Sequence, residues 1–267
     1  MNFNKYFVFL KAKWQESLEY RIDMFFYSLS VSLLPIMGMI IWLAFSATGT
    51  KLPMDKAQLT HYFIMIILVA NITASWKAWF VNEDIRTGNL SKYLTKPLSY
   101  LLVNFADVWG QKLVRLMFLI PSLIVIGFLV LGKDFLIFNV STLSFLLFIV
   151  SLLLAFWLWF TIDMIMGLLG FWLHDVDFLR GLSMLLEYLF SGKFIPIIFL
   201  PLAFQEISFY TPFRYIVSFP VEVLLQMVKG RDLFIGFGIQ FFWLAVLLIV
   251  YQFIYHKGLK LYQGYGS

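Results

Sequence analysis

Five long stretches of the chain contain no Lys, Arg, Asp or Glu and consist mainly of apolar residues: 24–50, 57–76, 116–132, 135–162 and 233–255. A helix needs roughly 20 such residues to cross the hydrocarbon core of a bilayer. Each stretch therefore predicts a membrane-spanning helix. We expect the second helix to continue past Lys77 to about Val81, and the third helix to begin upstream of its stretch, near Asp107.

A sixth apolar stretch, residues 178–204, is interrupted by charged residues and prolines: Arg180, Glu187, Lys193, Pro196 and Pro201. We expect its first part to form the fifth of six spans and the rest to bend. Six spans place both termini on one side of the membrane. Most of the 20 Lys and Arg residues fall on that side, so the positive-inside rule predicts that both termini are cytoplasmic.

The N-terminal segment 1–21 has a different pattern. Its apolar residues recur at intervals of three or four, which places them on one face of a helix: Phe3, Phe7, Leu10, Trp14 and Leu18. Lysines lie elsewhere on the helical wheel. Such an amphipathic helix is too charged to cross a bilayer and is expected to lie in the plane of the lipid headgroups.

The composition agrees with these predictions. Of 267 residues, 61% are apolar and 13% are charged, and the mean hydropathy is +0.86. Soluble domains are about 45–50% apolar and about 25% charged, so an ordinary soluble enzyme and a disordered chain are excluded. The absence of Cys excludes a disulfide scaffold. The net charge of +5 is explained by basic residues that flank the spans, so no nucleic-acid partner is expected.

The charged segment 82–97 lies between the second and third spans. We expect its acidic residues 83–84 at the N-terminus of a short helix, where negative charges interact favourably with the helix dipole. Leu90 and Leu94 are four positions apart and share a helical face, and Pro97 closes the element. The segment predicts a short helix with a small apolar face that docks in a groove of a soluble partner. A solvated connector is the alternative interpretation.

Two patterns in the sequence resemble the permeases of ABC-2 type transporters, and more narrowly the bacterial branch of uncharacterised ABC-type permease components. The first pattern is Glu83-Asp84-Ile85-Arg86-x-Gly88-x-Leu90-x-x-x-Leu94-x-x-Pro97, with Tyr93 between the two leucines. The second comprises Phe190-Ser191-Gly192, Ile195-Pro196, Phe199-x-Pro201, Pro212-Phe213 and Phe219-Pro220. Each motif alone is weak, and their order and spacing among the spans carry the resemblance, which extends over essentially the whole chain.

The resemblance implies an all-α integral membrane protein with six spans, which forms half of an exporter in the bacterial inner membrane. It implies a second permease, identical or paralogous, and two copies of a separate ATP-binding subunit. Residues 1–21 would be the elbow helix and 82–97 the coupling loop that touches the ATPase. Residues 191–231 would form extracellular re-entrant helices, with Gly192, Pro196, Pro201, Pro212, Phe213 and Pro220 as the gate region.

The prolines independently indicate that 191–231 is not one continuous helix. Irregular backbone at membrane depth survives only where protein or water covers it, so this segment is expected to line or cap a cavity. An ordinary extracellular loop is the alternative. No linker divides the chain, and we treat residues 1–267 as a single membrane domain.

No nucleotide-binding or catalytic motif is present in the sequence. The string G-x-x-x-x-G-K-[ST] does not occur, so ATP and Mg²⁺ are expected in a partner subunit and no cofactor in this chain. The histidines lie in different segments, and neither H-E-x-x-H nor G-x-S-x-G occurs. His174-Asp175-Val176-Asp177 contains metal-ligand residue types, but a polar turn between two spans is the favoured interpretation.

Three ionisable residues fall in or at the ends of predicted spans: Arg115, Asp163 and Glu187. Charged groups inside membranes are costly and often functional. We expect Arg115 at the start of the third span and Asp163 at the cytoplasmic end of the fourth, where they reach the interface or pair with each other. Glu187 is expected to face the transport cavity, a neighbouring helix or the seam between two permeases.

The sequence thus favours the permease subunit of an ATP-driven exporter, which is not itself an enzyme. A secondary transporter or channel is an alternative, and it requires a pathway of several buried charges. A membrane-embedded lipid-processing protein is another, for which no catalytic group is found. The sequence does not specify the transported substrate, because lipid-facing and cavity-facing positions are equally apolar.

Overall fold

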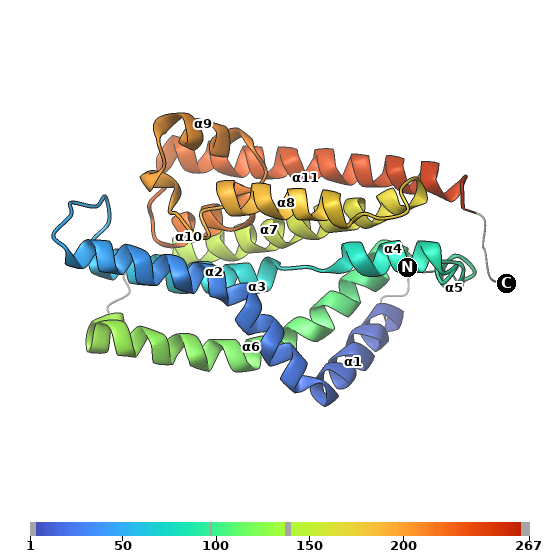
Figure 1. The fold of residues 1–267 in the computed structure, drawn as a ribbon, viewed down its shortest axis with the longest axis horizontal. Coiled ribbons are helices and arrows are strands. Elements are labelled where there is room, and N and C mark those ends of the chain that lie inside the picture. Colours follow the sequence, from blue (N-terminus) through green and yellow to red (C-terminus); the bar gives the residue numbers. More distant parts are fainter. Residues whose placement is uncertain (1–3, 97, 137–139, 263–267) are drawn as a thin grey trace.

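The computed structural model describes residues 4–96, 98–136 and 140–262, and within these ranges it contains helices and no strand (Figure 1). In chain order the helices are α1 (Asn4–Glu19), α2 (Arg21–Ala47), α3 (Lys56–Thr73), α4 (Lys77–Arg86), α5 (Ser91–Leu94), α6 (Tyr100–Leu131), η1 (Gly132–Leu136), α7 (Thr142–Leu168), η2 (Leu169–Phe171), α8 (Asp177–Phe190), η3 (Ile197–Phe199), α9 (Leu202–Tyr210), η4 (Arg214–Ile216), α10 (Ser218–Leu224) and α11 (Gly230–Leu259).

Five helical stretches in the described ranges are long and apolar enough to cross a membrane: α2, α3 with α4, α6 with η1, α7 with η2, and α11. The predicted fifth span, α8, has 14 residues. At 1.5 Å per residue it extends about 21 Å, less than the roughly 30 Å of a bilayer core. α8 alone is therefore shorter than this core, and the expected number of six spans stays a prediction. Figure 1 nevertheless shows α8 followed by α9 and α10 at the end of the molecule opposite α5.

The two ends of the described chain lie on the same half of the molecule. Figure 1 shows α1, α4, α5 and the end of α11 toward one end of the long axis. This arrangement agrees with the prediction that both termini face one side of the membrane. That this side is the cytoplasm remains a prediction from the Lys and Arg distribution.

α3 and α7 lie at the centre of the bundle: more than half of the most apolar part of their stretches is buried, whereas less than a third is buried in the stretches of α2, α6 and α11. One buried cluster joins α3, α7 and the segment before α11, with Phe63, Leu158, Tyr215 and Phe219 among its members. Large apolar side chains are exposed along α2, α6 and α11. Such broad apolar surfaces are expected where a helix faces lipid or another membrane protein.

Local sequence signals fix several helix ends. Asp55 and Gln58 form a capping box at the start of α3, with the Asp55 carboxylate accepting from the Gln58 N–H at 2.8 Å. The Ser141 hydroxyl accepts from the Ser144 N–H at the start of α7. Gly132, with φ of 60°, ends α6. At its other end α6 begins at Tyr100, so the helix of the third predicted span starts upstream of the expected position near Asp107.

The segment between α8 and α11 is a run of short helices separated by turns. Pro196 immediately precedes η3 and Pro201 immediately precedes α9, positions where the missing N–H is not needed. Pro212 and Phe213 lead into η4, and Pro220 lies in the first turn of α10. Gly192 has φ of 77°, and its carbonyl accepts a hydrogen bond from the Tyr62 hydroxyl at 3.1 Å.

The amphipathic helix α1 packs against α6. Gly110 of α6 allows the close approach, because a Cβ there would lie 2.8 Å from Lys13 Cβ and 2.9 Å from the Leu10 carbonyl oxygen. Phe7 and Leu18 remain exposed on α1, as expected for a helix at a membrane surface. Phe3, the first residue of the predicted apolar face, lies outside the described residues.

Replacing Gly110 with Ala should displace α1 and lower the stability of the protein by about 1–3 kcal/mol, because the added methyl group has no room. The matched control is Gly238→Ala on α11, where an added Cβ meets nothing within 4 Å. There the better helix propensity of Ala should leave stability unchanged or raise it by up to about 1 kcal/mol. Thermal unfolding of both variants in detergent measures the difference, and equal shifts would contradict the proposed contact.

Candidate functional site

The central helix of the bundle is interrupted inside the region expected to cross the membrane. α3 ends at Thr73 and α4 begins at Lys77, and the residues between them have non-helical backbone. The sequence predicted one helix continuing to about Val81, and that prediction is wrong. Backbone N–H and C=O groups exposed by such a break must find partners within the protein, because the bilayer core offers no water.

A lysine from α6 satisfies the carbonyl groups at the first side of the break. The Lys112 ammonium donates to the carbonyl oxygens of Asn71 and Ala74, and its side chain is 1% exposed. A positive charge at the C-terminal end of α3 also interacts favourably with the helix dipole. Lys112 therefore has a structural partner on α3 instead of an exposed position near the membrane surface.

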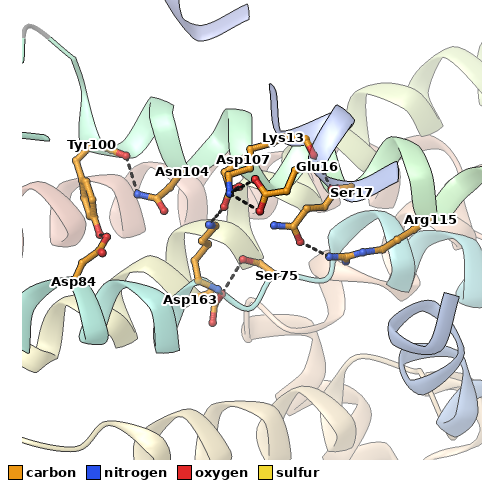
Figure 2. Close-up of polar contacts among 12 residues, drawn as sticks. Lys13, Glu16, Ser17, Ser75, Asp84, Tyr100, Asn104, Asp107, Arg115 and Asp163 are labelled. Carbon is orange, nitrogen blue, oxygen red and sulfur yellow. Dashed lines mark hydrogen bonds and ion pairs between the residues drawn. The ribbon is translucent and has the colours of Figure 1, made fainter. Parts of the chain in front are cut away.

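An aspartate from α7 satisfies the groups at the other side of the break. The buried Asp163 carboxylate accepts hydrogen bonds from the Ser75 hydroxyl, at 2.7 Å, and from the backbone N–H of Lys77 (Figure 2). A negative charge at the N-terminal end of α4 is favourable for the same reason. The break is thus held by opposite charges from two neighbouring helices, α6 and α7.

Arg115 and Asp163 do not pair with each other, contrary to one of the predictions. Arg115 lies in the interior of α6, not at the start of a span. Its guanidinium lies 3.6 Å from the centre of the Tyr27 ring and donates to the Gln111 side chain at 2.8 Å (Figure 2). It is buried, so it does not reach the interface either.

An ion-pair network extends from the break to the amphipathic helix. The Lys77 ammonium pairs with Asp107 of α6, and Lys13 of α1 lies 3.5 Å from the same carboxylate. Lys13 also pairs with Glu16 at 2.8 Å. Figure 2 shows Lys13 and Glu16 next to Asp107. Helices α1, α4 and α6 are therefore connected by charges next to the point where α3 and α4 separate.

Glu187 of α8 points into the protein and is 2% exposed. Its carboxylate pairs with the Lys193 ammonium at 2.5 Å, and Lys193 is also buried. In the structure the Glu187 side chain contacts Lys193 of its own chain and lines a cavity between α2, α7 and α8. That this cavity belongs to a transport pathway stays a prediction.

The α4–α5 turn contains the first resembling pattern, and its backbone differs from the expected one. Glu83 and Asp84 lie in the last turn of α4, so the prediction that they begin a helix is wrong. Gly88, with φ of 78°, reverses the chain after α4. The short helix that follows, α5, spans four residues. Pro97 lies outside the described residues.

Leu90 and Leu94 do not form a shared docking face. Leu90 is completely buried in a cluster with Val81 and Tyr100, whereas Leu94 is 43% exposed. Tyr93 packs edge-on against the ring of Tyr100. Leu90 and Tyr93 thus anchor the turn to the bundle, and Leu94 is left on its surface.

Charged residues surround the exposed part of the α4–α5 turn. Ile85 is half-buried, whereas Glu83, Arg86 and Lys92 are exposed. A cleft of about 580 Å³ lies beside them, between α4, η2 and the end of the described chain. It is lined by Trp79, Glu83, Arg86, His174 and Tyr262, among others.

Hydrogen bonds fix the surroundings of this cleft. The Tyr100 hydroxyl donates to Asp84 at 2.8 Å, and the Ser91 and Tyr262 hydroxyls lie 3.1 Å apart. Arg86 contacts the imidazole of His174 at 3.2 Å. His174 thus belongs to a polar turn beside α4, and in the described ranges no group of three or more His, Cys, Asp or Glu side chains is arranged to hold a metal ion.

Sequence reasoning missed Lys77, Asp107 and Lys112 as members of this site. Lys77 and Lys112 flank apolar stretches, where a basic residue is ordinarily an interface residue. Asp107 and Lys112 lie well inside α6, which begins at Tyr100. The spans were predicted from stretches without charged residues, so these two residues shortened the predicted helix.

These features define a polytopic α-helical membrane protein with a capped helix break in its centre. A family model described as ABC-2 family transporter protein matches residues 53–266, which is most of the chain. The chain therefore belongs to the ABC-2 transporter family, whose permeases are membrane components and not themselves catalytic. Comparison with curated proteins finds no significant match.

Replacing Lys112 with Met should lower the free energy of unfolding by about 3–5 kcal/mol, because the carbonyl groups of Asn71 and Ala74 lose their buried donor and Asp163 loses a nearby compensating charge. Unfolding in mixed micelles of increasing SDS content measures this loss. Lys133→Met, at an exposed position of η1, is the matched control and should be nearly neutral. Equal stability of the two variants would show that the ammonium does not hold the break.

Proposed function

We propose that the chain is the permease subunit of an ATP-driven ABC-2 type exporter and forms half of its translocation pathway. It pairs with a second permease, identical or paralogous, and with two copies of a separate ATP-binding subunit. ATP and Mg²⁺ bind that subunit, and both termini of the permease face the cytoplasm. Family membership and the five stretches that are long and apolar enough to cross a membrane support this proposal.

The observation that carries the proposal is the construction of the α4–α5 turn. Its buried Leu90 and half-buried Tyr93 attach it to the bundle, while Leu94, Glu83, Arg86 and Lys92 stay exposed. A firmly anchored turn with an exposed mixed surface suits docking against a soluble subunit. We assign the coupling role to this turn, with the cleft between Arg86 and Tyr262 as its neighbouring surface.

The contacts of α4 suggest how a displacement of the α4–α5 turn is transmitted to the membrane interior. α4 packs against α7, where a Cβ on Gly167 would lie 2.6 Å from Val81 Cβ. The break at residues 74–76 separates α4 from α3, so α4 is able to move without moving α3 as one rigid rod. ATP binding would change the position of α4 only if the two states of the ATPase bind the turn with different affinity.

The buried charges in the structure give more support to a secondary transporter than the sequence alone gave. A secondary transporter needs several ionisable groups inside the membrane, and Lys77, Lys112, Asp163, Glu187 and Lys193 are all buried. Each of them, however, is engaged in capping the helix break or in an ion pair. Transport by the purified chain alone in liposomes, driven by an ion gradient, would favour the secondary transporter and contradict the exporter. A lipid-processing activity has no catalytic group to support it.

Replacing Leu94 with Asp should weaken binding of the ATP-binding subunit by about tenfold or more, because it places a charge on the contact surface. The measurement uses the complex that the wild-type chain forms in mild detergent, and it records both the retained ATP-binding subunit and the ATPase rate. Leu202→Asp, an exposed leucine on α9 at the opposite end, is the matched control and should retain both.

Leu90→Asp serves a different purpose in this experiment. Because Leu90 is completely buried, this variant should unfold the turn and reduce the yield of folded protein. A Leu94→Asp protein that is folded, and that still binds and stimulates the ATPase normally, would contradict the coupling assignment.

A further inference from the structure

A cavity of about 230 Å³ lies between α2, the helix break, α7 and α8. Apolar side chains of α2 and α7 form part of its wall. Its polar lining includes Ser75, Asp163, Arg180, Ser183, Glu187 and Lys193.

Helix α8 has two distinct faces. Its large apolar side chains are exposed along one face, at Phe178, Leu182, Leu185 and Leu189. Its polar side chains, Arg180, Ser183 and Glu187, line the cavity on the other. Polar residues of membrane helices face the bundle interior or a hydrated cavity and often mark a pathway or a binding site.

Most of the charges in the cavity already have partners. Glu187 and Lys193 form an ion pair, and Asp163 accepts from Ser75 and from the backbone of α4. The guanidinium of Arg180 makes no hydrogen bond or ion pair with any described residue. Arg180 is therefore the cation in this cavity whose donors are available.

The position of Arg180 leaves its N–H groups available to bind an anion. Its guanidinium lies 4.6 Å from the centre of the Trp76 ring. Packing against a ring uses the flat face of the guanidinium and leaves its N–H edges available for a bidentate contact with a carboxylate or phosphate.

The cavity opens at the surface of the protein beside apolar side chains. Trp76 and Tyr188 both line it and are 42% and 40% exposed. Its volume is below that of a typical pocket for a drug-sized molecule, so it accommodates a small charged group and not a long apolar chain. An apolar chain attached to that group would lie outside, along the exposed sides of α2 and α8.

We propose that this cavity binds the anionic headgroup, a phosphate or carboxylate, of an amphiphilic molecule, with Arg180 as its charge partner. As a site for a transported molecule it rests on the proposed exporter function. Binding itself is a property of the chain alone, so the experiment is done without any ATP-binding subunit.

The test measures binding of decyl phosphate to the purified chain in dodecyl maltoside by titration calorimetry. Wild-type protein should bind decyl phosphate in preference to decyltrimethylammonium, which has the same chain length and opposite charge. Arg180→Gln should weaken binding by about tenfold or more, the usual effect of removing a charge-assisted bidentate contact. Arg231→Gln, at an exposed position of α11, is the matched control and should bind like wild type.

Several results would overturn the proposal. Unchanged affinity in a folded Arg180→Gln protein would exclude Arg180 as the charge partner, and a change only in oligomeric state would assign Arg180 to a protein interface. If that variant aggregates, Arg180→Lys replaces it, and affinity equal to wild type would exclude the bidentate contact. If inorganic phosphate binds the chain with the same affinity as decyl phosphate, the apolar chain contributes nothing, and an amphiphilic ligand is excluded. None of these results bears on the Leu94→Asp test, so the two proposals fail separately.

Discussion

The rest of the structure depends on the hydrogen bonds that hold the interrupted helix between α3 and α4. A helix break in a bilayer exposes carbonyl groups on one side and N–H groups on the other, and water cannot reach either. Lys112 supplies the donor and Asp163 the acceptor, each from a different helix of the bundle. These contacts satisfy the backbone groups at the break, so α3 and α4 remain two separate helices. The same contacts attach α6 and α7 to the break.

Other buried charges extend this arrangement to the membrane surface and to the α4–α5 turn. Lys77, at the start of α4, pairs with Asp107, and Asp107 lies beside Lys13 of α1. At the other end of α4, Asp84 accepts from Tyr100 at the start of α6. α4 is therefore attached through polar contacts at both ends and packed on α7 along its length. An element attached in this way is suited to transmit a displacement of the turn to the centre of the bundle.

Several predictions from the sequence were right, and two of the incorrect ones share a cause. The helical fold, the membrane character, the short helices between α8 and α11 and the ABC-2 family were all predicted correctly. The position of Arg115 within its helix, the start of α6 and the break after Thr73 were not. For Arg115 and for the start of α6, a charged residue was taken as the end of a span, because an unpaired charge is excluded from lipid. The structure pairs these charges inside the protein instead. The break after Thr73 was missed because the helix was expected to run on past Lys77.

The sequence by itself determined that the chain is a membrane protein and where most of its helices run, since hydrophobic length is a local property of the chain. Only the tertiary structure decided which polar residues are buried and what they contact. Leu90 and Leu94 have the same spacing and chemistry in sequence, yet one is an anchor and the other is exposed. Asp163 and Glu187 are both acidic residues among apolar neighbours, yet one caps a helix and the other pairs with Lys193. Partners far apart along the chain make these differences, and no local pattern encodes them.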